Sequence, residues 1–111
     1  NKDMEAIYKQ VSLEIERLSS DKKSIHQLEN FVNRYKGNIM TTIRTHLPGL
    51  NDMDYRLLCY LCAGFSAKAI SIFTGDSTNN IYVKKSRIKD IIVELKDENV
   101  KQEILDAITV R

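Results

Sequence analysis

The chain has 111 residues, of which 42% are apolar and 29% are charged, with one Pro and four Gly. This composition is ordinary for a globular protein, and the scarcity of Pro and Gly favours helices over a loop-rich or all-β fold. A chain of this length can bury one modest core. It has no apolar run of about 18 residues and no signal peptide, so we expect no transmembrane helix and a cytoplasmic location. Because the sequence begins with Asn, we expect a fragment of a longer parent protein, membrane-tethered or not.

Positive charge is concentrated in one stretch. The formal net charge is only +2, from 17 basic and 15 acidic residues, which is too small to indicate a nucleic-acid partner. Residues 77–89, however, contain Lys84, Lys85, Arg87 and Lys89 and no acidic residue. A local cationic surface of this kind is typical of a contact with a polyanion.

The two cysteines, Cys59 and Cys62, have the spacing C-x-x-C in an apolar run. A zinc site needs about four ligands, and His26 and His46 are far away in the sequence. A redox-active cysteine pair has the same spacing, but no predicted strand precedes Cys59, and no Pro or Gly lies between Cys59 and Cys62. We interpret the cysteines as two small apolar residues on one helix face, and we expect no metal and no cofactor.

The first segment, about 3–47, has an apolar residue at every seventh position: Met4, Val11, Leu18, Ile25, Val32 and Ile39. This heptad predicts a long N-terminal helix and a candidate coiled coil that pairs two chains through residues 4–43. Only half of the matching d positions are apolar, so an amphipathic helix or helical hairpin that packs on its own domain is the alternative. In a further alternative, Ser19-Ser20-Asp21 breaks this helix and caps a new one. Gly37 costs the helix about 1 kcal/mol, and Pro48 ends it.

Four shorter helices are predicted after residue 47. Asn51 and Asp54 resemble a capping box that opens a helix over 51–63, which Gly64 closes. Its expected buried stripe is Met53, Leu57, Leu58, Leu61 and Cys62. Ser66 and Ser77 are good N-caps for helices over 66–73 and 77–95, and Asn99 suggests a cap for the last helix. The inward residues of these helices are expected to be Ala69, Ile70, Phe73, Ile81, Ile88, Ile92, Leu95, Val100, Ile104, Leu105 and Ile108.

The sequence therefore predicts an all-α fold, with a long helical segment over 1–47 and a four-helix bundle over 48–111. Two helices joined by the short turn 74–76, which contains Gly75, match the geometry of a helix-turn-helix. Opposite the apolar stripe of the second helix lie Asn79, Tyr82, Lys85, Ser86 and Lys89. Asn can pair with adenine, and Lys can donate to guanine or to phosphate. We interpret 77–95 as a recognition helix for the major groove of double-stranded DNA, with a solvated amphipathic surface helix as the alternative.

Residues 50–92 resemble the LuxR/GerE-type helix-turn-helix found at the C-terminus of bacterial tetratricopeptide-repeat transcription regulators. The resemblance rests on Leu50, Asp54, Leu57-Leu58, the segment Gly64-Phe65-Ser66-Ala67-Lys68-Ala69-Ile70, and the spacing to Ser77, Asn80-Ile81 and Ile88. It implies base-facing positions at Tyr82, Val83 and Ser86, and phosphate contacts at Lys68, Lys85 and Lys89. Lys84 and Arg87 would make phosphate contacts or surface ion pairs. The candidate DNA-binding residues are Ser66, Lys68, Asn79, Asn80, Tyr82, Val83, Lys84, Lys85, Ser86, Arg87 and Lys89.

We therefore expect a DNA-binding transcription regulator that receives its signal from an upstream sensor or repeat domain. The alternative is a degenerate helix-turn-helix that serves as a protein-interaction or dimerisation module without binding DNA. An enzyme is not expected, because no catalytic set of side chains and no Gly-rich phosphate loop can be placed. No small-molecule ligand is implied.

Overall fold

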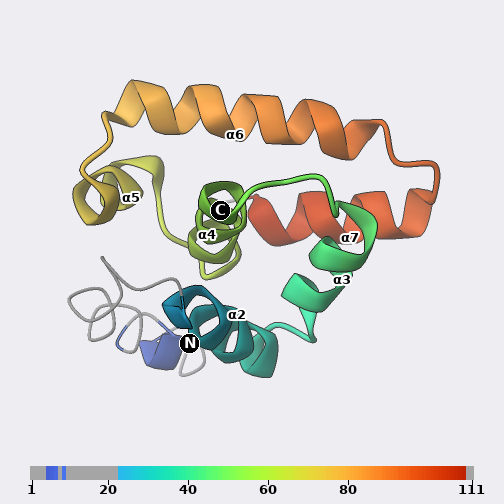
Figure 1. Ribbon diagram of the computed structural model, residues 1–111, viewed down its shortest axis with the longest axis horizontal. Helices are drawn as coiled ribbons and strands as arrows, with labels where there is room; N and C mark the ends of the chain where they lie inside the picture. Colours follow the sequence, from blue (N-terminus) through green and yellow to red (C-terminus); the bar gives the residue numbers. More distant parts are fainter. Residues whose placement is uncertain (1–4, 8, 10–22, 110–111) are drawn as a thin grey trace.

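The computed structural model describes residues 5–7, 9 and 23–109, and every regular element among them is helical. The all-α prediction is confirmed for this part of the chain (Figure 1). The helices, in chain order, are α2 (Lys23–Tyr35), α3 (Ile39–His46), α4 (Asp52–Cys62), α5 (Ala67–Thr74), α6 (Thr78–Val93) and α7 (Glu98–Ile108).

The helix expected to continue through residue 47 is interrupted, so that prediction is wrong at this point. α2 ends at Tyr35, and Gly37 and Asn38 then adopt left-handed backbone conformations with φ of 62° and 61°. Gly and Asn are the residues that tolerate this conformation best. Asn33 stabilises the new start, because its Oδ1 accepts a 2.7 Å hydrogen bond from the backbone N–H of Met40. Gly37 therefore separates two helices instead of weakening one.

The heptad positions that the structure describes face the chain's own core. Ile25, Val32 and Ile39 are 2%, 0% and 2% exposed, and they belong to one apolar cluster with residues of α4. This favours packing within the chain for 25–39. Pairing of two chains through 4–43 stays a prediction, and the heptad positions Met4, Val11 and Leu18 and the predicted break at 19–21 lie outside the described residues.

The predicted caps of α4, α5 and α6 are confirmed. Asn51 and Asp54 form a capping box, in which the Asp54 N–H donates to Asn51 at 2.9 Å and the Asn51 N–H donates to Asp54 at 3.3 Å. Gly64 has a φ of 92° just after α4. Ser66 and Ser77 accept hydrogen bonds from the backbone three residues on, both at 3.1 Å. Each N-cap satisfies a backbone donor that the first helical turn leaves unpaired.

Three details of the C-terminal half differ from the prediction. The N-cap of α7 is Asp97 and not Asn99, because the Asp97 carboxylate accepts from the N–H groups of Asn99 and Val100 at 3.0 and 3.1 Å. α6 ends at Val93, two residues before the expected Leu95. Met53, placed in the buried stripe of α4 by its spacing, is 56% exposed, although Asp54 and Tyr55 in the same turn are buried.

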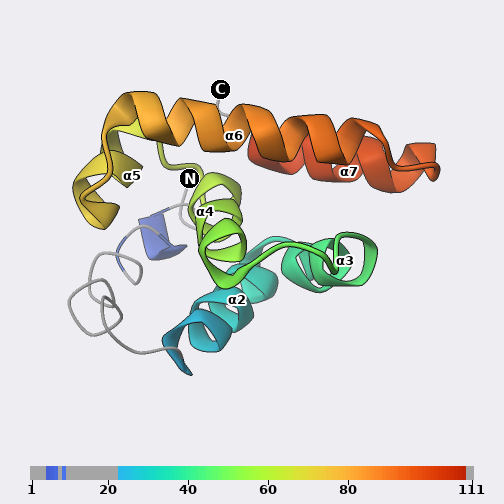
Figure 2. The same cartoon turned by 45° about the horizontal axis from the view of Figure 1, so that its top comes forward.

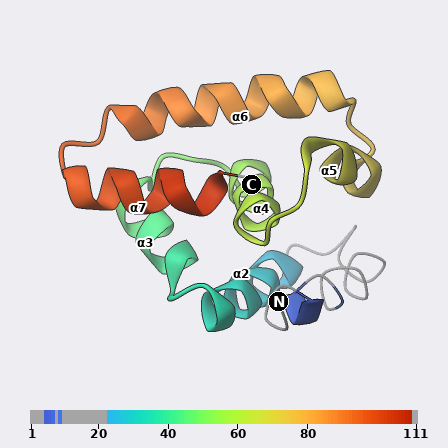
Figure 3. The same cartoon turned by 180° about the vertical axis from the view of Figure 1, so that it is seen from behind.

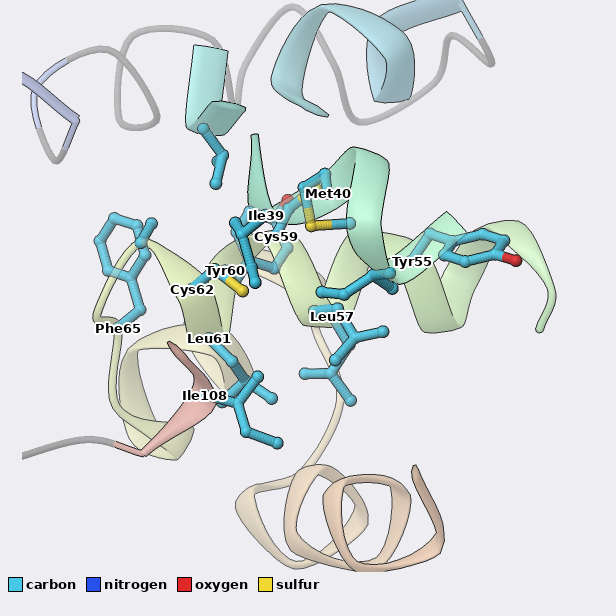
Figure 4. Close-up of a cluster of buried hydrophobic side chains, with 14 of the residues drawn as sticks. Ile39, Met40, Tyr55, Leu57, Cys59, Tyr60, Leu61, Cys62, Phe65 and Ile108 are labelled. Carbon is cyan, nitrogen blue, oxygen red and sulfur yellow. The ribbon is translucent and has the colours of Figure 1, made fainter. Parts of the chain in front are cut away.

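The core is built around α4. From Leu57 to Ala63 every side chain is buried, and α4 packs against α2, α3, α6 and α7. Figure 4 shows Ile39 and Met40 of α3 and Ile108 of α7 gathered around the α4 side chains. A helix that is apolar on all sides is one enclosed by its neighbours. The core thus crosses the expected boundary between 47 and 48, and the division into two domains stays a prediction.

A polar contact ties α2, α3 and α4 together at the edge of this core. Arg44 donates to both carboxylate oxygens of Glu29, from Nε at 2.7 Å and from Nη2 at 2.8 Å. Its guanidinium carbon lies 3.8 Å from the centre of the Tyr55 ring, and the Tyr55 hydroxyl donates to the Leu47 carbonyl at 2.5 Å. Glu29 is only 6% exposed, so the arginine supplies the charge partner that a buried carboxylate needs.

Candidate nucleic-acid interface

Helices α5 and α6 are joined by a short, internally bonded turn. Gly75 adopts the left-handed conformation, with a φ of 76°, and Ser77 then caps α6. The Ser71 hydroxyl donates to the Asp76 carbonyl at 2.6 Å, and the Asp76 N–H donates to the Thr74 hydroxyl at 3.2 Å. These bonds fix the direction in which the chain leaves α5 and therefore the angle at which α6 starts.

One apolar stripe holds α6 in place. Ile81, Ile88 and Ile92 are at most 2% exposed, and α6 packs against α5, α4 and α7. α6 and α7 run antiparallel, side by side (Figure 2). In Figures 1 and 3, α6 lies along one edge of the molecule, with no other labelled helix beyond it. Its outer side is therefore not covered by the helices of the described chain.

The outer side carries most of the residues expected to meet DNA. Asn79, Ser86 and Lys89 are exposed, and Tyr82 and Val83 are 58% and 59% exposed. Lys85 is half-buried at the edge of this side. A shallow hollow on the surface of α6 is lined by Tyr82, Lys85, Ser86, Lys89 and Asp90. This arrangement places an aromatic ring, a hydroxyl, two ammonium groups and one carboxylate around the same hollow of one helix.

Lys85 and Lys89 lie one helical turn apart and affect each other. Partial burial lowers the pKa of Lys85, and the positive charge of Lys89 lowers it further. Neither ammonium group has a carboxylate partner within 4.0 Å among the described residues. An anion placed between them would relieve the repulsion, while the exposed Asp90 carboxylate in the same hollow opposes it with a single charge.

Lys84 and Arg87 have acidic partners. Lys84 Nζ donates to Asp76 Oδ2 at 2.5 Å, and Arg87 Nη2 donates to Asp54 Oδ1. The ion-pair alternative is therefore what the structure shows for both residues. Neither partner was predicted from the sequence, because Asp76 lies just outside the acid-free stretch and Asp54 is 33 positions from Arg87. Of the two ion pairs, only Lys84–Asp76 could have been anticipated from the sequence, because these residues are eight positions apart.

The other three candidate residues lie near the starts of α5 and α6. Ser66 uses its hydroxyl oxygen to cap α5, and Lys68 is exposed in the first turn of that helix. Asn80 is exposed in the first turn of α6, and its N–H donates to Ser77. The N-terminus of α6 therefore adjoins the turn, while the N-terminus of α5 lies at the other end of that short helix, and each carries a partial positive charge.

The cysteines lie away from this surface. Cys59 and Cys62 are buried on α4, and burial raises the pKa of the Cys62 thiol to about 12 and that of Cys59 well above its usual value. Both are free thiols. Among the described residues, no group of three or more His, Cys, Asp or Glu side chains is arranged to hold a metal ion. The interpretation of the two cysteines as buried apolar residues is confirmed.

A second hollow lies between α2 and α3. It is lined by His26, Glu29, Asn30, Asn33, Met40, Thr41, Arg44 and Thr45. Its ionisable side chains already contact one another, since Arg44 binds Glu29 and His26 Nδ1 lies 3.8 Å from the same carboxylate. Asn33 is occupied by the start of α3. The hollow therefore offers no unpaired buried group to a ligand.

Comparison with known proteins gives no match: no family model matches the chain, and no curated protein or solved structure matches it at a significant level.

In the part of the chain that the structure describes, no helix has both the length and the apolar character that crossing a bilayer requires.

Proposed function

We propose that this chain is the DNA-binding domain of a transcription regulator and that α6 is its recognition helix. The observation that supports the proposal is the contrast between the two sides of α6. Its inner side is fixed by Ile81, Ile88 and Ile92, while its outer side presents polar and cationic groups without a covering helix. A helix with these two properties, preceded by a short helix and a tight turn, suits the major groove.

The side chains on the outer side have the chemistry that duplex DNA requires. Lys85 and Lys89 can meet phosphates, whose charge would offset the repulsion between the two ammonium groups. Asn79, near the start of α6, can form a bidentate pair with adenine, and Tyr82 can contact a base edge or a thymine methyl group. The resemblance to LuxR/GerE-type domains implies the same roles for Tyr82, Lys85 and Lys89, whereas the role of Asn79 rests on its chemistry alone.

The test measures binding to a duplex of about 20 base pairs by fluorescence anisotropy at several salt concentrations. The double variant Lys85→Gln/Lys89→Gln should bind all sequences more weakly, and the slope of log K against log salt should become shallower by about 1.8 for two lost phosphate contacts.

The matched control is Lys9→Gln/Lys96→Gln, which removes the same charge from two exposed lysines that lie outside α6 and have no ion pair with a described residue. This control should change binding by no more than about two-fold if the contacts are local. Failure of the wild-type chain to bind the duplex at low salt, or an equal loss in both double variants, would exclude α6 as the recognition helix.

A protein-interaction module is the second candidate. The supporting observation is that α6 also exposes Tyr82, Val83 and Val93, with exposed fractions of 58%, 59% and 47%. Exposed apolar side chains on one helix can mark a protein contact. Concentration-dependent association in sedimentation that Val83→Ser abolishes, together with no duplex binding, would favour this candidate.

A further inference from the structure

The four cations of α6 fall into two pairs with different surroundings. Lys84 and Arg87, three residues apart, pair with Asp76 and with Asp54. Lys85 and Lys89, four residues apart, have no acidic partner among the described residues within ion-pair distance. Residues three or four apart lie on the same side of a helix, so the two pairs occupy different sides of α6.

The two acidic partners come from elements that the rest of the fold holds in place. Asp54 is part of the capping box of α4 and its side chain is only 6% exposed. Asp76 belongs to the turn between α5 and α6, where both its N–H and its carbonyl are hydrogen-bonded. The Asp54 carboxylate cannot move outward without breaking the capping box, and the two hydrogen bonds of residue 76 hold the backbone from which the Asp76 carboxylate extends.

We propose that Asp76 and Asp54 are internal counterions that withhold Lys84 and Arg87 from a phosphate backbone, so that a polyanion is bound only by the Lys85–Lys89 side of α6. The inference rests on the proposed function and adds the side from which the duplex approaches. It also makes two acidic residues, which never touch the duplex, determinants of how strongly it is bound.

The physical reason is competition between two anions for one cation. A phosphate that approached Lys84 would also approach the Asp76 carboxylate, and the two negative charges repel. For Arg87 the competition is more one-sided, because its departure would leave the buried Asp54 carboxylate without a charge partner. An ion pair presents little net charge to a distant polyanion, so neither pair attracts the duplex as a free lysine does.

Asp76→Asn is the sharpest test. The substitution removes the charge that binds Lys84 and leaves the two backbone hydrogen bonds of residue 76 available. Lys84 should then become a phosphate contact. We expect an affinity gain of roughly five- to ten-fold at about 0.1 M salt and a salt slope steeper by about 0.9, measured on a duplex of arbitrary sequence.

Lys84→Gln completes a double-mutant cycle. In the wild-type background it should change the affinity by less than about two-fold, whereas in the Asp76→Asn background it should remove the whole gain. Glu103→Gln is the matched control, because it removes one negative charge from an exposed position on α7 that has no ion pair within the described chain. Circular dichroism of each variant checks that the helices are retained.

The outcomes separate the inference from the proposed function. A loss in Lys84→Gln equal to that of Lys89→Gln, or a gain in Glu103→Gln equal to that of Asp76→Asn, overturns the counterion role while leaving DNA binding intact. If the Asp76→Asn variant binds the duplex, the wild type does not, and adding Lys84→Gln abolishes the binding, the counterion role is supported and DNA binding is removed as the native function. No binding by either the wild type or Asp76→Asn overturns both.

Discussion

The guanidinium of Arg44 is bound along its edge by the carboxylate of Glu29 and lies with its flat face on the ring of Tyr55. The three residues come from α3, α2 and α4, so one side chain links three helices. The hydrogen bond to Glu29 is the largest cause of the raised pKa of Arg44. A paired, stacked guanidinium is a role that lysine cannot reproduce, because it lacks the planar fork.

Removing Arg44 should destabilise the fold more than neutralising its partner does. Arg44→Ala leaves the Glu29 carboxylate, 6% exposed, without a cation, and should lower the free energy of unfolding by about 2–4 kcal/mol. Glu29→Gln keeps one hydrogen-bond acceptor and should cost about 1–2 kcal/mol. Urea unfolding followed by circular dichroism measures both. A smaller loss in Arg44→Ala than in Glu29→Gln would show that the buried carboxylate does not depend on the arginine.

Gly75 and Gly49 provide a matched pair of glycine substitutions. Neither has a neighbouring atom within 4 Å of an added Cβ, but Gly75 has a φ of 76°. Gly75→Ala should therefore cost about 1 kcal/mol through backbone strain alone. Gly49→Ala should be neutral or should stabilise by up to about 1 kcal/mol, because alanine reduces the freedom of the unfolded chain. Equal urea midpoints for the two variants would contradict a left-handed turn at residue 75.

Val32 discriminates between the two interpretations of the heptad. Its side chain is fully buried within the chain's own core. Val32→Asp should therefore unfold or strongly destabilise the isolated chain, by more than about 3 kcal/mol, at every protein concentration. A seam between two chains would instead give a stability that rises with protein concentration in the wild type. Thermal unfolding over a hundred-fold range of concentration decides between them.

The buried thiols should be inert in the folded chain and should couple its stability to pH. Unfolded cysteine ionises at about pH 8.5. Burial raises the pKa of Cys62 to about 12. Between these values only the unfolded chain loses the proton, so the free energy of unfolding should fall as pH rises through this window and should be unaffected below it.

Two measurements check the thiol prediction. A thiol-specific chromogenic reagent at pH 8 should label the protein in urea and leave the native protein almost unlabelled. The fall of the urea midpoint above pH 8.5 should be shallower in Cys62→Ala than in the wild type. Rapid labelling of both cysteines in the native state would instead indicate that α4 is accessible.

Local signals in the sequence predicted much of this fold. The N-caps Asn51, Ser66 and Ser77 and the apolar stripe of α6 depend on residues within a few positions of one another. The helix break at Gly37 was misjudged, because a seven-residue repeat continues across two helices that pack on the same core. Spacing alone cannot distinguish that arrangement from a single helix.

The candidate site was predicted as a set of positions on α6 and at the start of α5, but the electrostatics of these positions were not predicted. Whether Lys84 and Arg87 are free depends on where Asp76 and Asp54 come to lie, and the second of these contacts joins residues 33 positions apart. A contact of that separation leaves no periodic trace in the sequence. The number of charges available on the outer side of α6 therefore followed only from the tertiary structure.

The central position of α4 has a consequence for how the two halves of the chain communicate. α2 and α3 are connected to α6 mainly through α4 and α7. α4 packs against α2, α3 and α6, and α7 packs against α3 and α6. α4 also supplies the Asp54 carboxylate that anchors Arg87. A tilt of α4 imposed from the N-terminal helices would therefore move the Asp54 carboxylate and, with it, the point at which Arg87 holds α6.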